Sequence, residues 1–275
     1  MTSSPPLTFA RVNGVNIHYA LREPAGGSAD RPALVFINSL GTDFRIWNAV
    51  AGAFADKWTI VLHDKRGHGL SELTPFPYAM DDHVGDVLAL LDHLGVQSFI
   101  PVGVSVGGMI SMGLLHRAPE RIPAAVLCDT GHRIGTNEIW DARIDTALNK
   151  GIEPMADAVM ERWFPQHYRE SHPVELAGWR AMLTRGPAEG YAGTSAALRE
   201  ADYTGTVPDI SVPVLCITGE NDLATPPELG KALAGLIPGA EYAQVDGSGH
   251  LPMIDNADAV IALLKPFLER AGGGA

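Results

Sequence analysis

The sequence predicts an α/β fold with a mostly parallel sheet, and three observations support this prediction. Short apolar runs rich in β-branched residues alternate with helical patterns along the chain. These runs are nearly continuous in hydrophobicity, as expected for strands that are covered on both faces. The alternation lapses between about 131 and 205, where no strand run occurs. We therefore expect helices on both faces of the sheet and a helical cap inserted between two strands.

Six apolar runs are the strand candidates. They lie at residues 33–37, 59–63, 98–104, 124–128, 212–218 and 240–245. Between them, residues 81–95 have the periodicity of an amphipathic helix, with Asp81 as the candidate N-cap. A further helical pattern covers 256–270, and Pro266 should kink or interrupt it.

This pattern divides the chain into a core and an insertion. Residues 1–130 and 206–270 form the predicted core, and residues 131–205 form a cap rather than an independent domain. The last residues, 271–275, read AGGGA and are predicted to be a flexible tail.

Charge restricts the partners that the protein can bind. The formal net charge of −12 repels phosphate backbones, so nucleic acid is an unfavourable partner. The same field gives no long-range attraction to an anionic substrate. If the substrate carries a carboxylate, a local cation beside the pocket must therefore recognise it.

Other features indicate a soluble cytoplasmic protein. The start of the chain has neither a basic segment nor an apolar segment of the kind found in secretory signals. The apolar stretch 99–115 is short and is interrupted by Pro101 and several glycines, which argues against a membrane span. Cys128 and Cys216 lie in apolar runs and are expected to be buried free thiols in a reducing compartment.

The stretch PVGVSVGGMI (101–110) contains the candidate nucleophile. Gly103-Val104-Ser105-Val106-Gly107 fits G-x-S-x-G, between a strand candidate and a helical run, which is the context of a nucleophile elbow. Small residues two positions before and after Ser105 allow a tight turn that presents the hydroxyl at the edge of the sheet. A Gly/Ser turn can also be purely structural. The pentapeptide therefore indicates a nucleophile only if a base and an acid occur elsewhere in the chain.

A serine hydroxyl needs a histidine base and a carboxylate that orients it, in the chain order serine, acid, histidine. Asp222 follows the strand candidate 212–218, and His250 follows the strand candidate 240–245. Both therefore lie at the sheet edge where Ser105 is expected. Asp129 ends another strand and is the competing acid, although we favour Asp222.

An oxyanion formed at this site requires backbone donors. The amide of Val106, at the start of the helix after Ser105, is one candidate. The second is expected in the loop NSLGTD after the strand at 33–37, where the amide of Leu40 is the candidate. No H-E-x-x-H metal motif and no G-x-G-x-x-G dinucleotide motif occurs, so neither a metal nor a cofactor is expected.

These motifs resemble the α/β-hydrolase superfamily over essentially the whole chain. HDKRGHGLS (63–71) is similar to a superfamily motif that shapes the floor of the fold, which implies structural roles for Asp64 and Arg66 and no catalytic role for His68. FINSLGTDFRIW, GVSVGGMI and the two loops carrying the acid and the histidine are more narrowly similar to 3-oxoadipate enol-lactonases.

At two positions, the sequence can be compared with the pattern of the family that it resembles. Most hydrolases of the fold carry His-Gly where this chain has Asn38-Ser39, a difference that these lactonases share. The family elbow is usually Gly-x-Ser-Met-Gly-Gly, and here Val106 replaces the methionine. Since only the backbone amide of this residue is required, the replacement affects the prediction little.

The resemblance implies hydrolysis of 3-oxoadipate enol-lactone, a small anionic lactone of aromatic catabolism, through an acyl-enzyme and without a cofactor. A cation must then face the pocket, and Arg133 is the candidate because it follows Asp129 by four residues. Trp140 is expected to close the same wall. A solvated position on the cap is an equally valid interpretation of Arg133.

Other functions remain open at this point. Carboxylesterases and C–C bond hydrolases use the same three residues, and the cap that distinguishes them cannot be interpreted from the sequence. A slow hydrolase-like ligand receptor would keep these residues too, but would turn over its ligand on the order of minutes rather than at about 1–10³ s⁻¹. The oligomeric state is not predicted.

Overall fold

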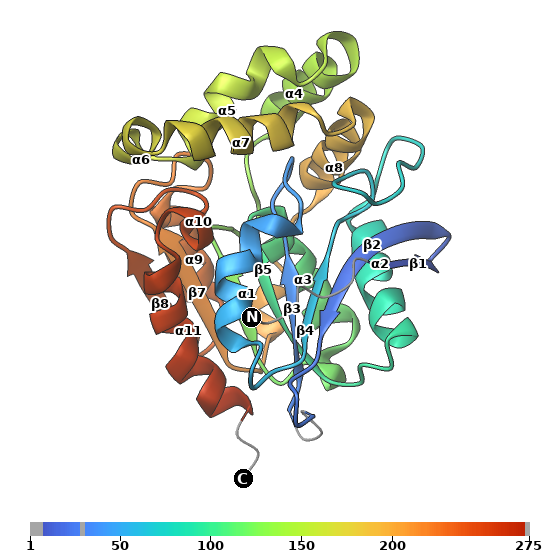
Figure 1. Cartoon of the computed structure of the whole chain (residues 1–275), viewed down its shortest axis with the longest axis vertical. Helices are drawn as coiled ribbons and strands as arrows, with labels where there is room; N and C mark the ends of the chain where they lie inside the picture. Colours follow the sequence, from blue (N-terminus) through green and yellow to red (C-terminus); the bar gives the residue numbers. More distant parts are fainter. Residues whose placement is uncertain (1–7, 28–30, 273–275) are drawn as a thin grey trace.

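A sheet of eight strands forms the centre of the computed structural model, which describes residues 8–27 and 31–272 (Figure 1). The strand order is β1-β2-β4-β3-β5-β6-β7-β8. The strands are β1 (Thr8–Val12), β2 (Val15–Arg22), β3 (Ala33–Ile37), β4 (Ile60–His63), β5 (Phe99–Val104), β6 (Ala125–Cys128), β7 (Val214–Gly219) and β8 (Glu241–Val245). Pairings from β4 to β8 are parallel, whereas β2 is antiparallel to both β1 and β4. The predicted mostly parallel sheet is confirmed, and the hairpin of β1 and β2 is an addition to the six predicted strands.

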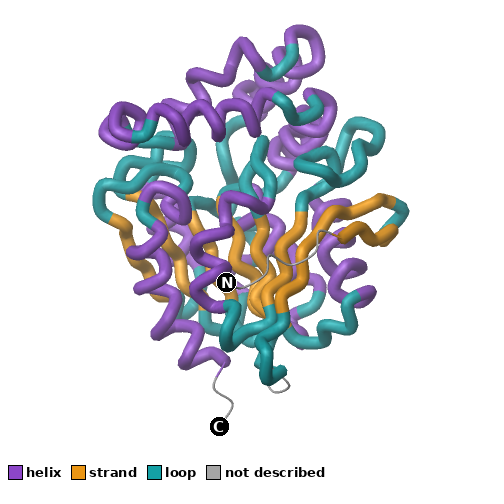
Figure 2. The backbone as a smooth tube through the Cα atoms, viewed as in Figure 1, coloured by secondary structure: helices purple, strands orange, loops and turns teal. Residues whose placement is uncertain are grey.

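Helices cover both faces of this sheet (Figure 2). They are α1 (Asn48–Phe54), α2 (Met80–His93), α3 (Val106–Arg117), α9 (Pro227–Leu236), α10 (Pro252–Asp255) and α11 (Ala257–Gly272). Helices α1 and α11 pack together on one face, and α2 and α3 pack together on the other. Every residue of β3, β4, β5, β6 and β7 is buried, which explains their nearly continuous hydrophobic runs.

Two expectations about helix boundaries are wrong. Helix α2 begins at Met80 with Ala79 as its N-cap, and the Asp82 carboxylate, not Asp81, accepts the Ala79 N–H at 2.8 Å. Helix α11 runs through Pro266 without interruption. Pro266 is on the exposed side of α11, whereas Leu264 and Phe267 are buried in the core. Packing of the apolar face therefore outweighs the hydrogen bond that proline removes.

The tail also begins later than expected. Ala271 and Gly272 belong to α11, and Gly272 packs closely against the Trp58 ring, where a Cβ would overlap the indole. Residues 273–275 of the predicted tail lie outside the described residues.

The segment between β6 and β7 consists of helices that lie over the C-terminal edge of the strands, at the top of Figure 1. They are α4 (Asn137–Lys150), α5 (Ala156–Trp163), α6 (Gln166–Ser171), α7 (Pro173–Thr184) and α8 (Ala188–Glu200). We call this segment the cap. Within the described part of the chain, no helix combines the length and the apolar character that a membrane crossing requires.

Candidate active site

Ser105 occupies the turn between β5 and α3. Its φ of 59° and ψ of −121° are strained for a residue with a side chain. The Ser105 N–H donates to the Cys128 carbonyl at 3.0 Å, and the Ser105 carbonyl accepts from the Thr130 hydroxyl at 2.7 Å. The adjacent strand β6 and the residues after it thus hold the turn in this conformation.

The glycines around Ser105 are required by close packing. A Cβ on Gly103 would overlap the carbonyl of Gly107, and a Cβ on Gly107 would overlap the carbonyl of Ile37 at the end of β3. Because these contacts are with backbone atoms, no side-chain adjustment could relieve them. The turn therefore packs against both α3 and β3 only when these positions lack side chains.

Asp222 and His250 meet in the loops after β7 and β8. His250 Nδ1 lies 2.8 Å from Asp222 Oδ2, and both side chains are buried. The other Asp222 oxygen accepts the backbone N–H groups of Ala224 at 2.7 Å and Thr225 at 3.0 Å. The Thr225 hydroxyl lies 2.6 Å from Asp222 Oδ2. These contacts fix the carboxylate in the position that orients the imidazole.

Asp129, the competing acid, has a different environment. It is fully buried, has a φ of 43°, and accepts the Gly219 N–H at 2.7 Å through Oδ1. Burial and then the charge of Asp222 raise the pKa of Asp129 well above its ordinary value. His250 is paired with Asp222 and not with Asp129. Asp129 thus holds its proton more tightly than an ordinary aspartate, and the carboxylate that contacts the histidine is that of Asp222.

Ser105 and His250 line one cavity of about 190 Å³ beneath the cap. Leu40 lines it as well, and Val106 directly follows Ser105 as the first residue of α3. Neither the Leu40 N–H nor the Val106 N–H donates a hydrogen bond to any described residue. His250 Nε2 lies 3.5 Å from the Ser39 hydroxyl oxygen. The cavity therefore brings together the Ser105 hydroxyl, the His250 imidazole and Leu40, and the Val106 amide directly follows Ser105.

Arg133 does not belong to this cavity. It lies 3.4 Å from Asp202 in an ion pair in which both side chains are about half exposed. Proximity to Asp129 in sequence is misleading because the next residues, Ile134 and Gly135, line the cavity while the Arg133 side chain is exposed. The cavity does include Trp140, the other residue predicted for this wall, and its indole N–H donates to the Ile134 carbonyl at 2.6 Å.

Two other arginines of the cap line the cavity. Arg143 comes from α4 and Arg162 from α5, and Tyr191 of α8 lies with them. Burial and then the charge of Arg143 lower the pKa of Arg162, so the two guanidinium groups repel each other. Burial raises the pKa of Tyr191, and the charge of Arg143 opposes that shift.

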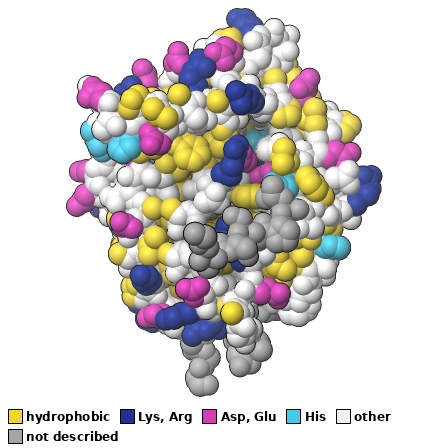
Figure 3. All heavy atoms as spheres, viewed as in Figure 1, with side chains coloured by type: hydrophobic (Ala, Val, Ile, Leu, Met, Phe, Trp, Pro, Cys, Tyr) yellow, Lys and Arg dark blue, Asp and Glu magenta, His cyan; other side chains and the backbone are white. Residues whose placement is uncertain are grey.

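These arginines differ from others on the cap. Figure 3 shows acidic and basic side chains interspersed over the cap at the top of the view. Arg180 pairs with Glu153 and Asp157, each at 2.7 Å. In contrast, Arg143 and Arg162 have no carboxylate partner among residues 8–27 and 31–272. Their charge is thus available to an anion in the cavity.

A sequence signal for Arg143 exists. It follows Trp140 by three residues, which places both on the same side of a helix, and its guanidinium carbon lies 5.0 Å from the centroid of the Trp140 ring. Because Trp140 was assigned to the pocket wall, helical periodicity could also have assigned Arg143 to that wall. Arg162 belongs to a different helix, α5, and lines the same cavity because of how the helices of the cap pack, which no local pattern indicates.

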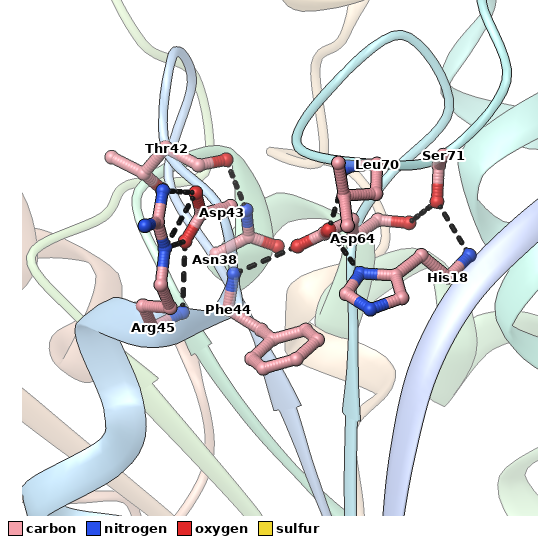
Figure 4. Close-up of polar contacts among 9 residues, drawn as sticks. All are labelled: His18, Asn38, Thr42, Asp43, Phe44, Arg45, Asp64, Leu70 and Ser71. Carbon is pink, nitrogen blue, oxygen red and sulfur yellow. Dashed lines mark hydrogen bonds and ion pairs between the residues drawn. The ribbon is translucent and has the colours of Figure 1, made fainter. Parts of the chain in front are cut away.

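The motif at 63–71 organises the loops below the cap (Figure 4). The Asp64 carboxylate accepts the N–H groups of Phe44 and Leu70, each at 2.9 Å, and lies 2.7 Å from His18 Nδ1. Arg66 forms a two-bond pair with Asp86, each bond 2.7 Å. These contacts agree with the structural roles expected of Asp64 and Arg66.

A larger cavity, of about 620 Å³, lies between α7 and the loops at 41–45 and 67–70. His18, Asp64 and His68 line it, and Ser105 and His250 do not. Tyr191 borders both cavities. The smaller cavity, which Ser105 and His250 line, is therefore the candidate active site. Within the described ranges, no group of three His, Cys, Asp or Glu residues is arranged to hold a metal ion.

Comparison with known proteins places this geometry in a family. Residues 32–151 match the model of the alpha/beta hydrolase fold, and residues 192–272 match that of TAP-like proteins. The chain is 35% identical over 252 residues to 3-oxoadipate enol-lactonase 2 of Acinetobacter baylyi, covering 90% of this chain and 94% of that protein.

Solved structures give a similar result. The enol-lactonase from Burkholderia xenovorans LB400 has a TM-score of 0.91 and 38% identity, covering 95% of this chain and 99% of its own. A hydrolase from Pseudomonas aeruginosa PA01 has a TM-score of 0.90 and 31% identity, covering 97% of this chain and 99% of its own.

The chain belongs to the α/β-hydrolase family, and its fold and relatives support an ester-hydrolysing enzyme. Within that family, its similarity to 3-oxoadipate enol-lactonases extends over nearly the whole chain.

Proposed function

We propose that this protein hydrolyses 3-oxoadipate enol-lactone to 3-oxoadipate, a step of aromatic catabolism in the β-ketoadipate pathway. The observation that carries the proposal is the pair Arg143 and Arg162, which lines the same cavity as Ser105 and His250 without carboxylate partners. Two guanidinium groups that repel each other are stabilised when an anion binds between them. A small substrate with one carboxylate and one reactive carbonyl suits such a cavity.

In the proposed reaction, Ser105 Oγ attacks the lactone carbonyl while His250 takes the hydroxyl proton. Asp222 holds the imidazole in the required orientation through Nδ1. The carbonyl π electrons move to oxygen, and the oxyanion accepts hydrogen bonds from the amides of Leu40 and Val106.

Collapse of this intermediate breaks the acyl carbon–oxygen bond and opens the ring. The leaving oxygen departs as an enolate, which takes the proton from His250 and tautomerises to the ketone. Water, deprotonated by His250, then attacks the acyl-Ser105 ester and releases 3-oxoadipate. Because an enolate is a good leaving group, we expect deacylation to limit turnover.

The test is loss of the ultraviolet absorbance of the enol-lactone with wild-type protein and with Ser105→Ala, without added metal. We expect fast turnover by the wild type and none by the variant. If the lactone persists while p-nitrophenyl acetate is cleaved in a Ser105-dependent way, the protein is a hydrolase for another ester. Turnover on the scale of minutes would instead identify a ligand receptor.

A further inference from the structure

Lys65 is a buried cation below the candidate oxyanion loop. Its side chain is among the largest in the protein that are fully buried, and its Nζ donates to the carbonyl oxygens of Asn38 at 3.1 Å and Ser39 at 2.8 Å. Strands β3 and β4 are parallel neighbours, so the loops that follow them meet at one edge of the sheet. This topology brings Lys65, two residues after β4, against the residues that follow β3.

Burial of this amine is costly. Burial lowers the pKa of Lys65 to about 7, although the charges of Asp64 and Asp43 oppose the shift. A methionine would fill similar space without that cost. The neutral amine retains two N–H donors, one for each carbonyl, so both hydrogen bonds persist in either protonation state. Because an apolar side chain would avoid this cost, we expect Lys65 to have a role that an apolar side chain cannot perform.

The geometry of a peptide unit suggests that role. The C=O and the N–H of a trans peptide lie in one plane and point in opposite directions. The Ser39 carbonyl and the Leu40 N–H belong to the same peptide, which is trans. When Lys65 holds the Ser39 carbonyl on one side, the Leu40 N–H is directed to the other side, where Leu40 and Ser105 line the cavity.

We propose that Lys65 is a positioning residue that aims the Leu40 N–H at the oxyanion by holding the carbonyls of Asn38 and Ser39. This inference deepens the proposed function and rests on it for the oxyanion. It concerns any carbonyl substrate attacked by Ser105, and therefore not only the lactone.

Other contacts stabilise the same loop. The Thr42 hydroxyl donates to the Ser39 carbonyl at 2.9 Å, and the Asn38 side-chain amide donates to the Thr42 carbonyl. Figure 4 shows Asn38 and Thr42 joined in this way, with the Asp64 carboxylate holding Phe44 beyond them. Thr42 is thus a second anchor for the carbonyl that Lys65 holds.

The test compares Lys65→Met with wild type on the enol-lactone and on p-nitrophenyl acetate. We expect kcat to fall about tenfold to a hundredfold on both substrates with little change in KM, since loss of a whole oxyanion donor costs about 10²–10³ in kcat. Lys57→Met, which removes an exposed lysine elsewhere, is the matched control and should behave as wild type.

A second readout separates positioning from general damage. Trifluoroacetophenone forms a Ser105 adduct in which the serine oxygen bonds to the ketone carbon, the proton passes to His250 and the ketone oxygen becomes an oxyanion. Its inhibition constant should rise in Lys65→Met by the factor by which kcat/KM falls. Binding of 3-oxoadipate, whose carboxylates are planar and do not form a tetrahedral oxyanion, should weaken less than the ketone adduct.

The outcomes distinguish the two proposals. A folded Lys65→Met protein with wild-type kcat on both substrates overturns the role of Lys65, as does equal weakening of the ketone and of 3-oxoadipate. If Lys65→Met does not fold, Thr42→Val decides: the proposal fails unless that variant lowers kcat and weakens the ketone adduct. If wild type ignores the lactone, the substrate assignment fails, and the effect of Lys65 is still measured with p-nitrophenyl acetate.

Discussion

Arg143 stacks on Trp140, one helical turn earlier in α4, with its guanidinium carbon 5.0 Å from the ring centroid. Stacking on an aromatic face holds the guanidinium without neutralising it, in contrast to an ion pair with a carboxylate. Arg143 therefore presents a positioned charge to the cavity that Ser105 and His250 line. In a protein of net charge −12, such a local cation is what recognition of an anionic substrate requires.

Replacing Arg143 with alanine should raise KM for the enol-lactone about tenfold to a hundredfold, because a hydrogen bond to a charged group contributes about 1.5–3 kcal/mol. Hydrolysis of the neutral p-nitrophenyl acetate should change little. Steady-state kinetics on both substrates measure the difference. Arg133→Ala is the matched control, since Arg133 lies in an exposed ion pair with Asp202 outside the cavity. Equal effects of the two substitutions would contradict carboxylate recognition by Arg143.

The two buried acids should respond differently to replacement by asparagine. Asp222→Asn removes the carboxylate that contacts His250, and kcat should fall about 10³- to 10⁴-fold. Asp129→Asn should retain activity within a few-fold, because Asp129 does not contact His250 and the raised pKa of its carboxyl favours the uncharged form that asparagine resembles. Kinetics with either substrate test this, and a large loss in Asp129→Asn would assign the orienting role to Asp129.

The stability of Asp129→Asn should also depend on pH. The native carboxyl keeps its proton over a pH range in which the unfolded chain, with a pKa of about 3.9, has released it. Wild-type stability therefore falls as pH rises through that range, whereas asparagine has no proton to hold. The melting temperature of the variant relative to wild type should increase as pH rises above about 4, and asparagine also tolerates the φ of 43°. A constant difference between the two proteins would contradict the raised pKa.

The strained turn at Ser105 predicts a trade-off between stability and activity. Ser105→Gly should be inactive but more stable than Ser105→Ala, because glycine adopts a φ of 59° without steric cost. We expect a difference of about 1 kcal/mol in the free energy of unfolding, measured by urea denaturation. If the alanine variant were the more stable, the turn would not be strained by its side chain.

Much of this architecture could be predicted because local pattern and tertiary environment agree. Strands buried on both faces need continuous apolar runs, and tight turns between a strand and a helix need glycine. Both features can therefore be identified from residues that are adjacent in sequence. The order of Ser105, Asp222 and His250 could be interpreted for the same reason, since each follows a strand whose carboxyl end lies at one edge of the sheet. In contrast, Pro266 was expected to break a helix that its buried face holds intact.

What the sequence by itself determined was the sheet, the helical character of the cap and the residues that follow each strand, because these depend on short-range periodicity and on strand direction. Only the tertiary structure decided which arginines face the cavity, which buried acid contacts His250, and that Lys65 lies under Ser39. Those relationships join residues from separate elements. Their geometry depends on how the elements pack, and the local pattern of residues along the chain does not predict that packing.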